Sequence, residues 1–231
     1  MVCYLWNDGS REFLPQHVNV LQRMVSRHLS EPHRFICITD EKRESFNDGV
    51  EVFPTPPAAR HVGENRSPEG ARFPSCYRRL WTFSDEAREL GEQVLLLDVD
   101  LVVVGDLAPI MACDADFMGW RPFRDWGRKM RFGGGIYLLK TGTRTEVWKR
   151  FEGAQSIVKA RTAGFRGSDQ AWISYVLGDR EPYWQRDSGI YSIRDMSGSE
   201  AVLPKDARLV QFNGPTKPWR SPLPWVKEHW R

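Results

Sequence analysis

Residues 95–104 have the sequence LLLDVDLVVV, in which Asp98 and Asp100 interrupt a continuous hydrophobic run. Such a run is typical of a buried strand, and two buried carboxylates are costly unless a cation or hydrogen bonds compensate them. Their two-residue spacing on an extended chain places both on one side. Mg²⁺ or Mn²⁺ prefers oxygen ligands and keeps positions open for water or substrate phosphates, so a divalent metal site is one interpretation. The alternative is that Asp98 caps a turn and Asp100 is a solvated residue at the strand end.

On both sides of this stretch, short apolar runs alternate with segments of helical periodicity, which predicts an α/β fold. The expected strands cover residues 2–6, 34–39, 50–53, 94–97, 116–120, 136–139 and 208–212. One helix is expected to begin at Pro15 and another at Ser168. A third would bury Leu80, Phe83, Ala87 and Leu90 and end at Gly91, and a fourth would follow a capping box of Thr143 and Glu146. Residues 61–73 have loop composition.

Composition narrows the class of protein. The chain has 231 residues, 41% of them hydrophobic, which is enough for one domain with its own core. The 33 basic and 30 acidic residues leave a net charge of +3, which does not favour nucleic acid as a partner. Cys3, Cys37, Cys76 and Cys113 lie far apart, which argues against a zinc ribbon or a disulfide framework. Because there is neither a spanning apolar run nor a signal sequence, we expect a cytoplasmic protein.

Five short motifs occur in a characteristic order along the chain. They are YRRLW (77–81), LLLDVDLVVV (95–104), FGGGIYLL (132–139), SDQ (168–170) and VQFNG with KPW (210–214 and 217–219). Together they resemble the GT-A fold glycosyltransferases, especially the retaining family eight of the glycogenin and bacterial galactosyltransferase group. The resemblance implies a single GT-A α/β domain, with a central mixed sheet flanked by helices. Residues 1–104 would form the nucleotide-binding half, 105–219 the donor-sugar and acceptor half, and 220–231 a tail.

The resemblance also implies an activity. The protein would transfer a sugar from a nucleotide sugar, a UDP-sugar in particular, to a hydroxyl acceptor with retention at the anomeric carbon. The acceptor would be a glycan, a lipid-linked molecule or another hydroxyl compound. Two other classes remain as alternatives: a non-catalytic module that binds nucleotide sugars or glycans, and a haloacid dehalogenase-type phosphatase, which also has Asp-x-Asp after a hydrophobic run.

The resemblance assigns donor-binding roles to particular residues. Asp98 and Asp100 would hold Mn²⁺ or Mg²⁺ on the donor diphosphate, and Arg79 would contact the donor. The alternative for Arg79 is a surface ion pair with an acidic residue at position 85 or 86. The base and ribose would lie at the ends of the first two expected strands, and Gly214 would border the donor. The end-of-strand residues, which are equally suited to ordinary turns, are Trp6, Asn7, Thr39 and Asp40.

Three residues are candidates for the transfer step. Asp169 would hydrogen-bond the donor sugar, Gln170 would lie near the reacting carbon, and Lys217 would bind the β-phosphate of the leaving group. The alternative for Asp169 is that it satisfies free amides at a helix N-terminus.

This sequence departs from the family pattern at two positions. Gln211 stands where the family has a metal-binding histidine, and its amide oxygen is a weaker ligand than imidazole, so either Gln211 or Asn213 would be the third metal ligand. Gly133 replaces the asparagine of the third motif.

Two basic, aromatic segments have two interpretations each. Residues 121–131 form either a flap over the acceptor or a solvated loop. The tail after Trp219, with Trp225 and Trp230 among basic residues, either packs onto the domain or makes a peripheral membrane contact.

Overall fold

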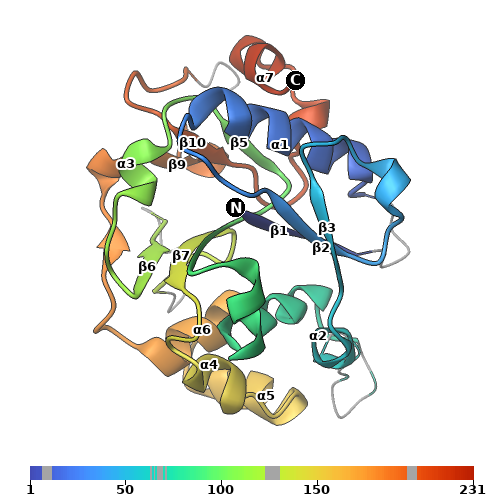
Figure 1. Ribbon diagram of the computed structural model, residues 1–231. Coiled ribbons are helices and arrows are strands. Elements are labelled where there is room, and N and C mark those ends of the chain that lie inside the picture. Colours follow the sequence, from blue (N-terminus) through green and yellow to red (C-terminus); the bar gives the residue numbers. More distant parts are fainter. Residues whose placement is uncertain are drawn as a thin grey trace.

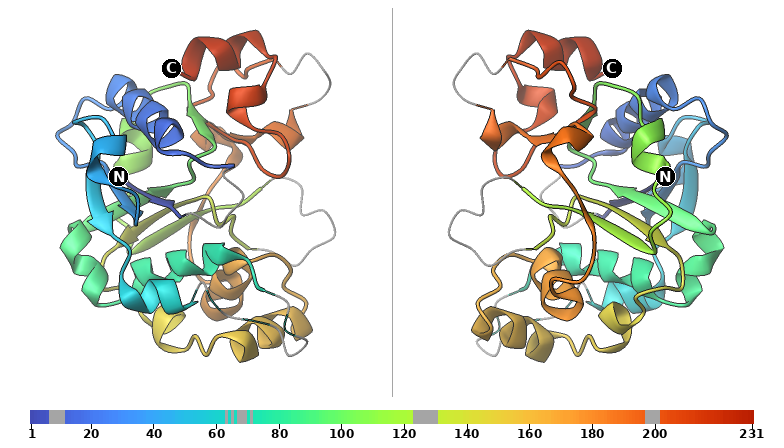
Figure 2. Two further views of the ribbon diagram at one scale, coloured as in Figure 1. Left: turned by 90° about the vertical axis from the view of Figure 1, so that its right-hand side faces the viewer. Right: turned by 90° about the vertical axis from the view of Figure 1, so that its left-hand side faces the viewer.

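The computed structural model describes residues 1–6, 12–62, 64, 66, 70, 72–122, 131–196 and 202–231. The elements form three layers, with a seven-stranded sheet in the middle (Figures 1 and 2). A small three-stranded sheet and three helices cover one face of the central sheet, at the top of Figure 1. Further helices cover the opposite face, at the bottom of the same view.

The central sheet has the strand order β3-β2-β1-β4-β7-β6-β8. The strands are β1 (Val2–Leu5), β2 (Ile36–Thr39), β3 (Glu51–Pro54), β4 (Gln93–Leu97), β6 (Phe117–Trp120), β7 (Ile136–Lys140) and β8 (Tyr183–Trp184). The first four in the chain pair in parallel, whereas β7 is antiparallel to both β4 and β6, and β6 pairs in parallel with β8. The expected α/β fold with a central mixed sheet is therefore confirmed.

The small sheet has the order β5-β10-β9. Its strands are β5 (Leu101–Val103), β9 (Ile190–Ser192) and β10 (Leu209–Gln211), and the helices of this layer are α1 (Pro15–His28), α3 (Ala108–Met111) and α7 (Pro224–His229). The helix predicted from Pro15 is confirmed, and its apolar stripe of Val18, Leu21 and Val25 is completely buried.

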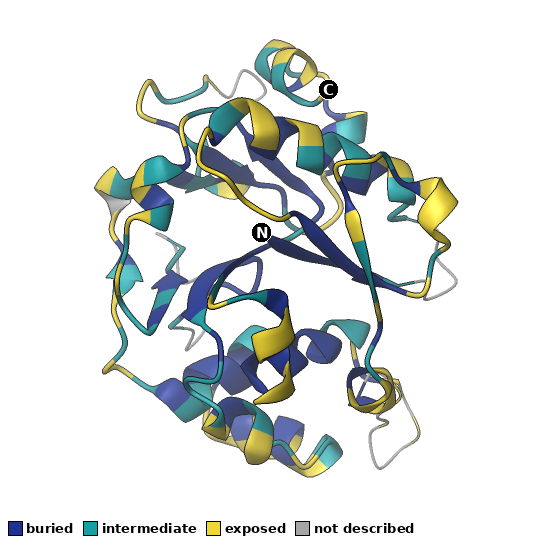
Figure 3. Cartoon of the chain, in the orientation of Figure 1, coloured by how far each residue is buried: buried dark blue, intermediate teal, exposed yellow. Residues whose placement is uncertain are grey.

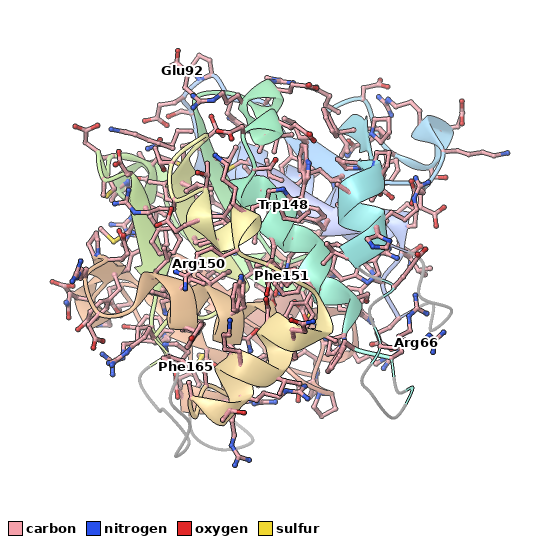
Figure 4. The ribbon with its side chains drawn as sticks, turned by 90° about the horizontal axis from the view of Figure 1, so that it is seen from below. Arg66, Glu92, Trp148, Arg150, Phe151 and Phe165 are labelled. Atoms are coloured by element: carbon pink, nitrogen blue, oxygen red, sulfur yellow. The ribbon has the colours of Figure 1, made fainter. Side chains whose placement is uncertain are left out.

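The opposite layer contains the helices α2 (Pro57–Val62), α4 (Glu146–Lys149), α5 (Ala154–Thr162) and α6 (Asp169–Leu177) and the 3₁₀-helices η2 (Ser75–Phe83) and η3 (Glu86–Leu90). Shorter 3₁₀ turns elsewhere in the chain are η1 (Arg43–Ser45), η4 (Arg186–Ser188), η5 (Ile193–Asp195) and η6 (Pro218–Arg220). Figure 4 shows this layer from below, with Trp148 on α4, Phe151 in the connection after it, and Phe165 after the end of α5.

Both faces of the central sheet are buried, which explains its continuous hydrophobic strands (Figure 3). On β4, Leu95 and Leu97 pack into the core under the small sheet and α1, whereas Val94 and Leu96 pack into the core under the opposite layer. This alternation follows from the two-residue period of a strand.

The predicted strand at residues 94–97 is β4, but the hydrophobic run continues into a second strand, β5, that was not predicted. β4 ends at Leu97 in the central sheet, and β5 begins at Leu101 in the small sheet. Between them the chain turns, and the Leu101 amide donates to the Asp98 carbonyl at 3.2 Å. The hydrophobic run therefore consists of two buried strands in two sheets, and the carboxylates lie at the turn between them.

Two local predictions were wrong. The helix expected to end at Gly91 is two 3₁₀-helices, because Ser84 adopts an extended conformation and its hydroxyl accepts the Ala87 amide proton at 3.2 Å. The predicted capping box is absent, because the Thr143 hydroxyl donates to the Lys140 carbonyl at 2.7 Å instead, and α4 begins without a side-chain cap.

The tail packs onto the domain. Trp219 stacks on His17 of α1 with ring centroids 3.9 Å apart, Trp230 lies 5.8 Å from Trp219, and Trp225 lies 6.1 Å from Phe212. These contacts support the packed interpretation of the tail. Most of the segment 121–131 lies outside the described residues. Within the described part of the chain, no helix combines the length and the apolar character needed to span a bilayer.

Candidate active site

Arg79 joins two of the motifs found in the sequence. It lies on η2 and is 7% exposed. One guanidinium nitrogen donates to Asp98 at the end of β4, and the other donates to Oδ1 of Asp169 at 2.8 Å. Asp169 is completely buried at the start of α6. The proposed surface ion pair of Arg79 is not formed, because Asp85 pairs with Lys149 and Glu86 accepts from Trp81.

Lys217 joins the end of the chain to the same turn. Its Nζ donates to Oδ2 of Asp100 at 2.6 Å, and both residues are buried. The ammonium also lies 4.7 Å from the centre of the Phe13 ring. The turn between β4 and β5 therefore has a cation on each of its two carboxylates.

Burial is the main cause of the pKa shifts of the two carboxyls at this turn. It raises the pKa of Asp98 above the ordinary value of a carboxyl, although Arg79 opposes the rise. Burial and the charge of Asp98 together raise the pKa of Asp100 to about 6, and Lys217 opposes the rise. Burial lowers the pKa of Arg79, but the charges of Asp169 and Asp98 outweigh it and raise that pKa well above its usual value. Arg79 is thus a permanent cation, whereas the two carboxyls would gain from a further positive charge.

Glycines bring the third motif close to the carboxylates. The Asp98 amide donates to the Gly135 carbonyl at 2.8 Å. A Cβ on Gly135 would overlap the side chains of Gln211 and Asp98, and a Cβ on Gly134 would lie 3.2 Å from both Arg79 and Asp169. Gly134 and Gly135 therefore leave room for side chains of the four other motifs.

A first cavity of about 170 Å³ opens beside the turn. Its walls are mostly apolar, with Trp6 and Phe13 as aromatic surfaces, and its base holds Arg79, Asp98 and Asp100. A flat aromatic ring fits such a cleft, and a charged group fits its base.

A second cavity of about 280 Å³ lies on the other side of Arg79 and Asp98 and is more polar. Its lining includes the three glycines of the third motif, Gln170 and Ser168 from the SDQ motif, and Gln211, Asn213 and Gly214 from the last motif. Arg79 and Asp98 line both cavities, so the two spaces meet at this ion pair.

The remaining candidate residues lie apart from these cavities or beneath them. Thr39 is buried, and its hydroxyl accepts the Glu41 amide proton at 3.1 Å. Asp40 is half-exposed and pairs with Arg60 at 2.7 Å. Neither lines the two cavities, and their contacts are those of turn-forming residues. Asp169 lies beneath Arg79 rather than on the cavity surface.

Asn7 lies outside the described residues. Asn213 lies two residues beyond the end of β10, and both Gln211 and Asn213 line the second cavity, so either remains a candidate for the third metal ligand.

Some lining residues had no signal in the sequence. Phe13 and Cys76 of the first cavity, and Arg166, Ser192 and Arg194 of the second, belong to no motif. Phe13 and Arg166 lie in connections, Cys76 and Arg194 on 3₁₀-helices, and Ser192 at the end of β9. Tertiary packing sets their positions, which periodicity does not reveal.

The side-chain oxygens at this turn could bind a divalent metal whose remaining ligands come from a substrate. Asp98 and Asp100 provide two carboxylates. The Gln211 amide nitrogen donates to Oδ2 of Asp98 at 3.5 Å, so the side-chain oxygen of Gln211 would reach the same place if the amide turned over. Within the described ranges, no group of three or more His, Cys, Asp or Glu side chains is placed to hold a metal. Mg²⁺ is commonly bound by one or two carboxylates together with substrate phosphates. Such a shared site suits this arrangement better than a metal held by the protein alone.

Comparison with solved structures shows that the chain has the GT-A fold of glycosyltransferases, as the motifs predicted. It is similar to the galactosyltransferase LgtC, solved with donor and acceptor sugar analogs, at a TM-score of 0.64 and 14% identity over 98% of this chain and 92% of that one. The glycosyltransferase GlyE of Streptococcus pneumoniae TIGR4 matches at a TM-score of 0.61 and 15% identity, over 98% of this chain and 61% of that one.

Mouse xyloside xylosyltransferase 1 matches at a TM-score of 0.56 and 12% identity, over 96% of this chain and 98% of that one. No family model and no curated protein sequence matches the chain.

Proposed function

We propose that this protein is a glycosyltransferase that moves a sugar from a nucleotide sugar, in particular a UDP-sugar, to a hydroxyl group of an acceptor. The observation that carries the proposal is that two chemically different cavities meet at Arg79 and Asp98. The apolar, aromatic cavity suits a nucleoside, and the polar cavity suits sugars. The fold supports this interpretation over a haloacid dehalogenase-type phosphatase.

The charges at the meeting point explain how a diphosphate would be held. Arg79 and Lys217 face three carboxylates, those of Asp98, Asp100 and Asp169. Among these five side chains, two cations against three anions leave one net negative charge at the turn, which attracts a divalent cation. Donor binding should therefore require added positive charge.

Asp98 and Asp100, with Gln211 or Asn213, would hold Mn²⁺ or Mg²⁺. When bound, the ion would act as a Lewis acid that stabilises the charge on the departing nucleoside diphosphate. Lys217 would then release Asp100 and bind the β-phosphate instead. Its ammonium already contacts the turn at which the diphosphate would bind. Arg79 would keep Asp98 oriented, since Asp169 fixes the other side of its guanidinium.

The sugar and the acceptor would occupy the second cavity. Gln170 borders it, and Ser168 holds its carboxamide, because the Ser168 hydroxyl lies 2.7 Å from Oε1 of Gln170. Gln170 would place its amide near the reacting carbon and stabilise charge in the transition state. Retention at the anomeric carbon, which the family resemblance implies, and the expected cytoplasmic location stay predictions.

Screening nucleotide sugars tests the proposal. We expect UDP-sugars to raise the melting temperature only with Mn²⁺ or Mg²⁺ present, because a ligand of the folded state stabilises it. One of them should release UDP when an acceptor is added, and Asp100→Asn should abolish that release. Stabilisation without release for any donor and acceptor would instead identify a non-catalytic binding module. Hydrolysis of simple phosphate esters would identify a phosphatase.

A further inference from the structure

The second cavity holds two arginines that the proposed reaction does not use. Arg166 precedes α6 and Arg194 lies on η5, and both are exposed and line the cavity. Within the described ranges, neither guanidinium has a hydrogen bond or an ion pair to another residue. Other arginines near this side of the molecule are paired, as Arg144 is with Glu181 and Arg131 with Asp179.

The fold places Arg194 against the site. The Arg194 amide donates to the Ser192 hydroxyl at 3.2 Å, and that hydroxyl lies 3.4 Å from Oδ1 of Asn213. Gly214 has φ +82°, and a Cβ there would overlap the Arg194 guanidinium. Glycine at this position therefore allows the positive φ and leaves room for Arg194 beside Asn213.

Arg166 is placed in the cavity lining by its neighbours in the sequence. The preceding residue, Phe165, is 5% exposed and packs edge-on against Tyr175 of α6 at 5.9 Å. The following residue, Gly167, has φ +129°, and a Cβ there would overlap the side chain of Gln170. A buried anchor and a glycine turn thus hold the backbone of Arg166 next to the proposed reacting group.

The charge of the cavity lining is unbalanced. Three arginines border it, and the carboxylate in its lining, Asp98, is already bonded to Arg79. Arg79 also pairs with Asp169, so neither Arg166 nor Arg194 has a carboxylate partner among the residues that line the cavity. Planar guanidinium groups bind carboxylates and phosphates through charge-assisted hydrogen bonds.

We propose that the second cavity takes a sugar bearing a carboxylate or phosphate group, which Arg166 and Arg194 bind. The inference rests on the proposed function, and it specifies the chemical class of one of its substrates. The anionic group belongs either to the donor sugar, as in a uronic acid, or to the acceptor.

Binding measurements on matched compounds distinguish these sources. The donor arm compares UDP-glucuronic acid with UDP-glucose in the presence of Mn²⁺. The acceptor arm compares methyl galactoside 6-phosphate with methyl galactoside in the presence of UDP and Mn²⁺. Each compound is titrated calorimetrically into the wild-type protein, into Arg166→Gln, Arg194→Gln and the double variant, and into Arg23→Gln. Arg23 is an exposed arginine on α1 that lines neither cavity, so its variant is the control.

We expect the charged member of one pair to bind about tenfold more tightly, as charge-assisted hydrogen bonds allow. The double variant should lose that preference, whereas Arg23→Gln should keep it. The affinity for UDP should be the same in all the variants. Preference in the donor arm identifies a charged donor sugar, and preference in the acceptor arm identifies a charged acceptor.

Three results would overturn the inference: equal binding within both pairs, a preference that the double variant keeps, or weaker binding of UDP itself in the double variant. The last result would assign the arginines to the diphosphate. Because these titrations measure binding, absence of sugar transfer would contradict the proposed function without deciding this inference.

Discussion

Lys217 and Asp100 are separated by 117 positions in the sequence, yet Nζ of one lies 2.6 Å from Oδ2 of the other in a buried setting. This contact places the last motif of the chain on the turn between β4 and β5. A buried ion pair is costly to break from one side, because the remaining charge is left without a partner.

A double-mutant cycle tests this pair. We expect Asp100→Asn and Lys217→Met each to lower the free energy of unfolding by about 2–4 kcal/mol, and the double variant to lose less than the sum, because it leaves no lone charge. Urea denaturation measures all four proteins. Strictly additive losses would show that the two side chains do not depend on each other.

Arg79 has a structural role in addition to the proposed role in donor binding. Replacing it by Met leaves the fully buried Asp169 without its cation, so the free energy of unfolding should fall by about 3–5 kcal/mol. Arg131→Met, which breaks an ion pair with the exposed Asp179, is the matched control and should cost less than about 1 kcal/mol. Equal losses in the two variants would contradict the buried role of Arg79.

Mn²⁺ binding should be coupled to UDP binding. Two carboxylates already paired with cations are a poor metal site alone, and the diphosphate provides the missing oxygen ligands. Calorimetry should therefore find weak Mn²⁺ binding to the free protein and much tighter binding with UDP present. Gln211→His should raise the affinity without UDP, because imidazole is the better ligand.

The position of the third ligand decides the outcome of this experiment. Asn213→Ala is the matched variant at the neighbouring amide. Tight Mn²⁺ binding by the wild-type protein alone, unaffected by Gln211→His but lost in Asn213→Ala, would assign the third ligand to Asn213.

His17 should make the fold sensitive to acid. Burial lowers its pKa below the usual 6.5; Glu12 opposes this shift and Arg220 adds to it. Its Nδ1 accepts the Leu14 amide proton at 3.1 Å, which requires that nitrogen to be unprotonated. The unfolded chain therefore takes up the proton more readily, and the free energy of unfolding falls as the pH drops through about 6.5.

Denaturation at pH 7.5 and 5.5 measures this effect. His17→Gln should show a smaller difference between the two pH values than the wild-type protein. His33→Gln, at an exposed histidine with a local backbone contact, should show the wild-type difference. An unchanged difference in His17→Gln would contradict the assignment.

The positions of most central strands along the chain could be predicted from the sequence, because a strand buried on both faces appears as a short apolar run, as residues 94–97 do. The strand β5 could not, because an apolar run does not reveal that its two halves belong to different sheets. Nor could the break at Ser84, where one side-chain hydrogen bond outweighs an otherwise helical pattern.

The same limit applies to the site. The motifs identified Arg79, Asp98, Asp100 and Lys217, which the fold brings together. The sequence did not show that Asp169 lies beneath Arg79, because residues 90 positions apart come into contact only through tertiary packing. Arg166 and Arg194 gave no signal for the same reason.

The turn at Asp98 and Asp100 has a mechanical consequence. One carboxylate follows the last residue of a strand in the central sheet, and the other precedes the first residue of a strand in the small sheet. At this point the two sheets are joined by a single turn of the chain. A ligand that contacts both carboxylates would therefore restrict the motion of one sheet relative to the other. Hydrogen exchange at the β5 and β10 amides should slow when such a ligand binds, so these amides would report on occupancy of the site even in the absence of turnover.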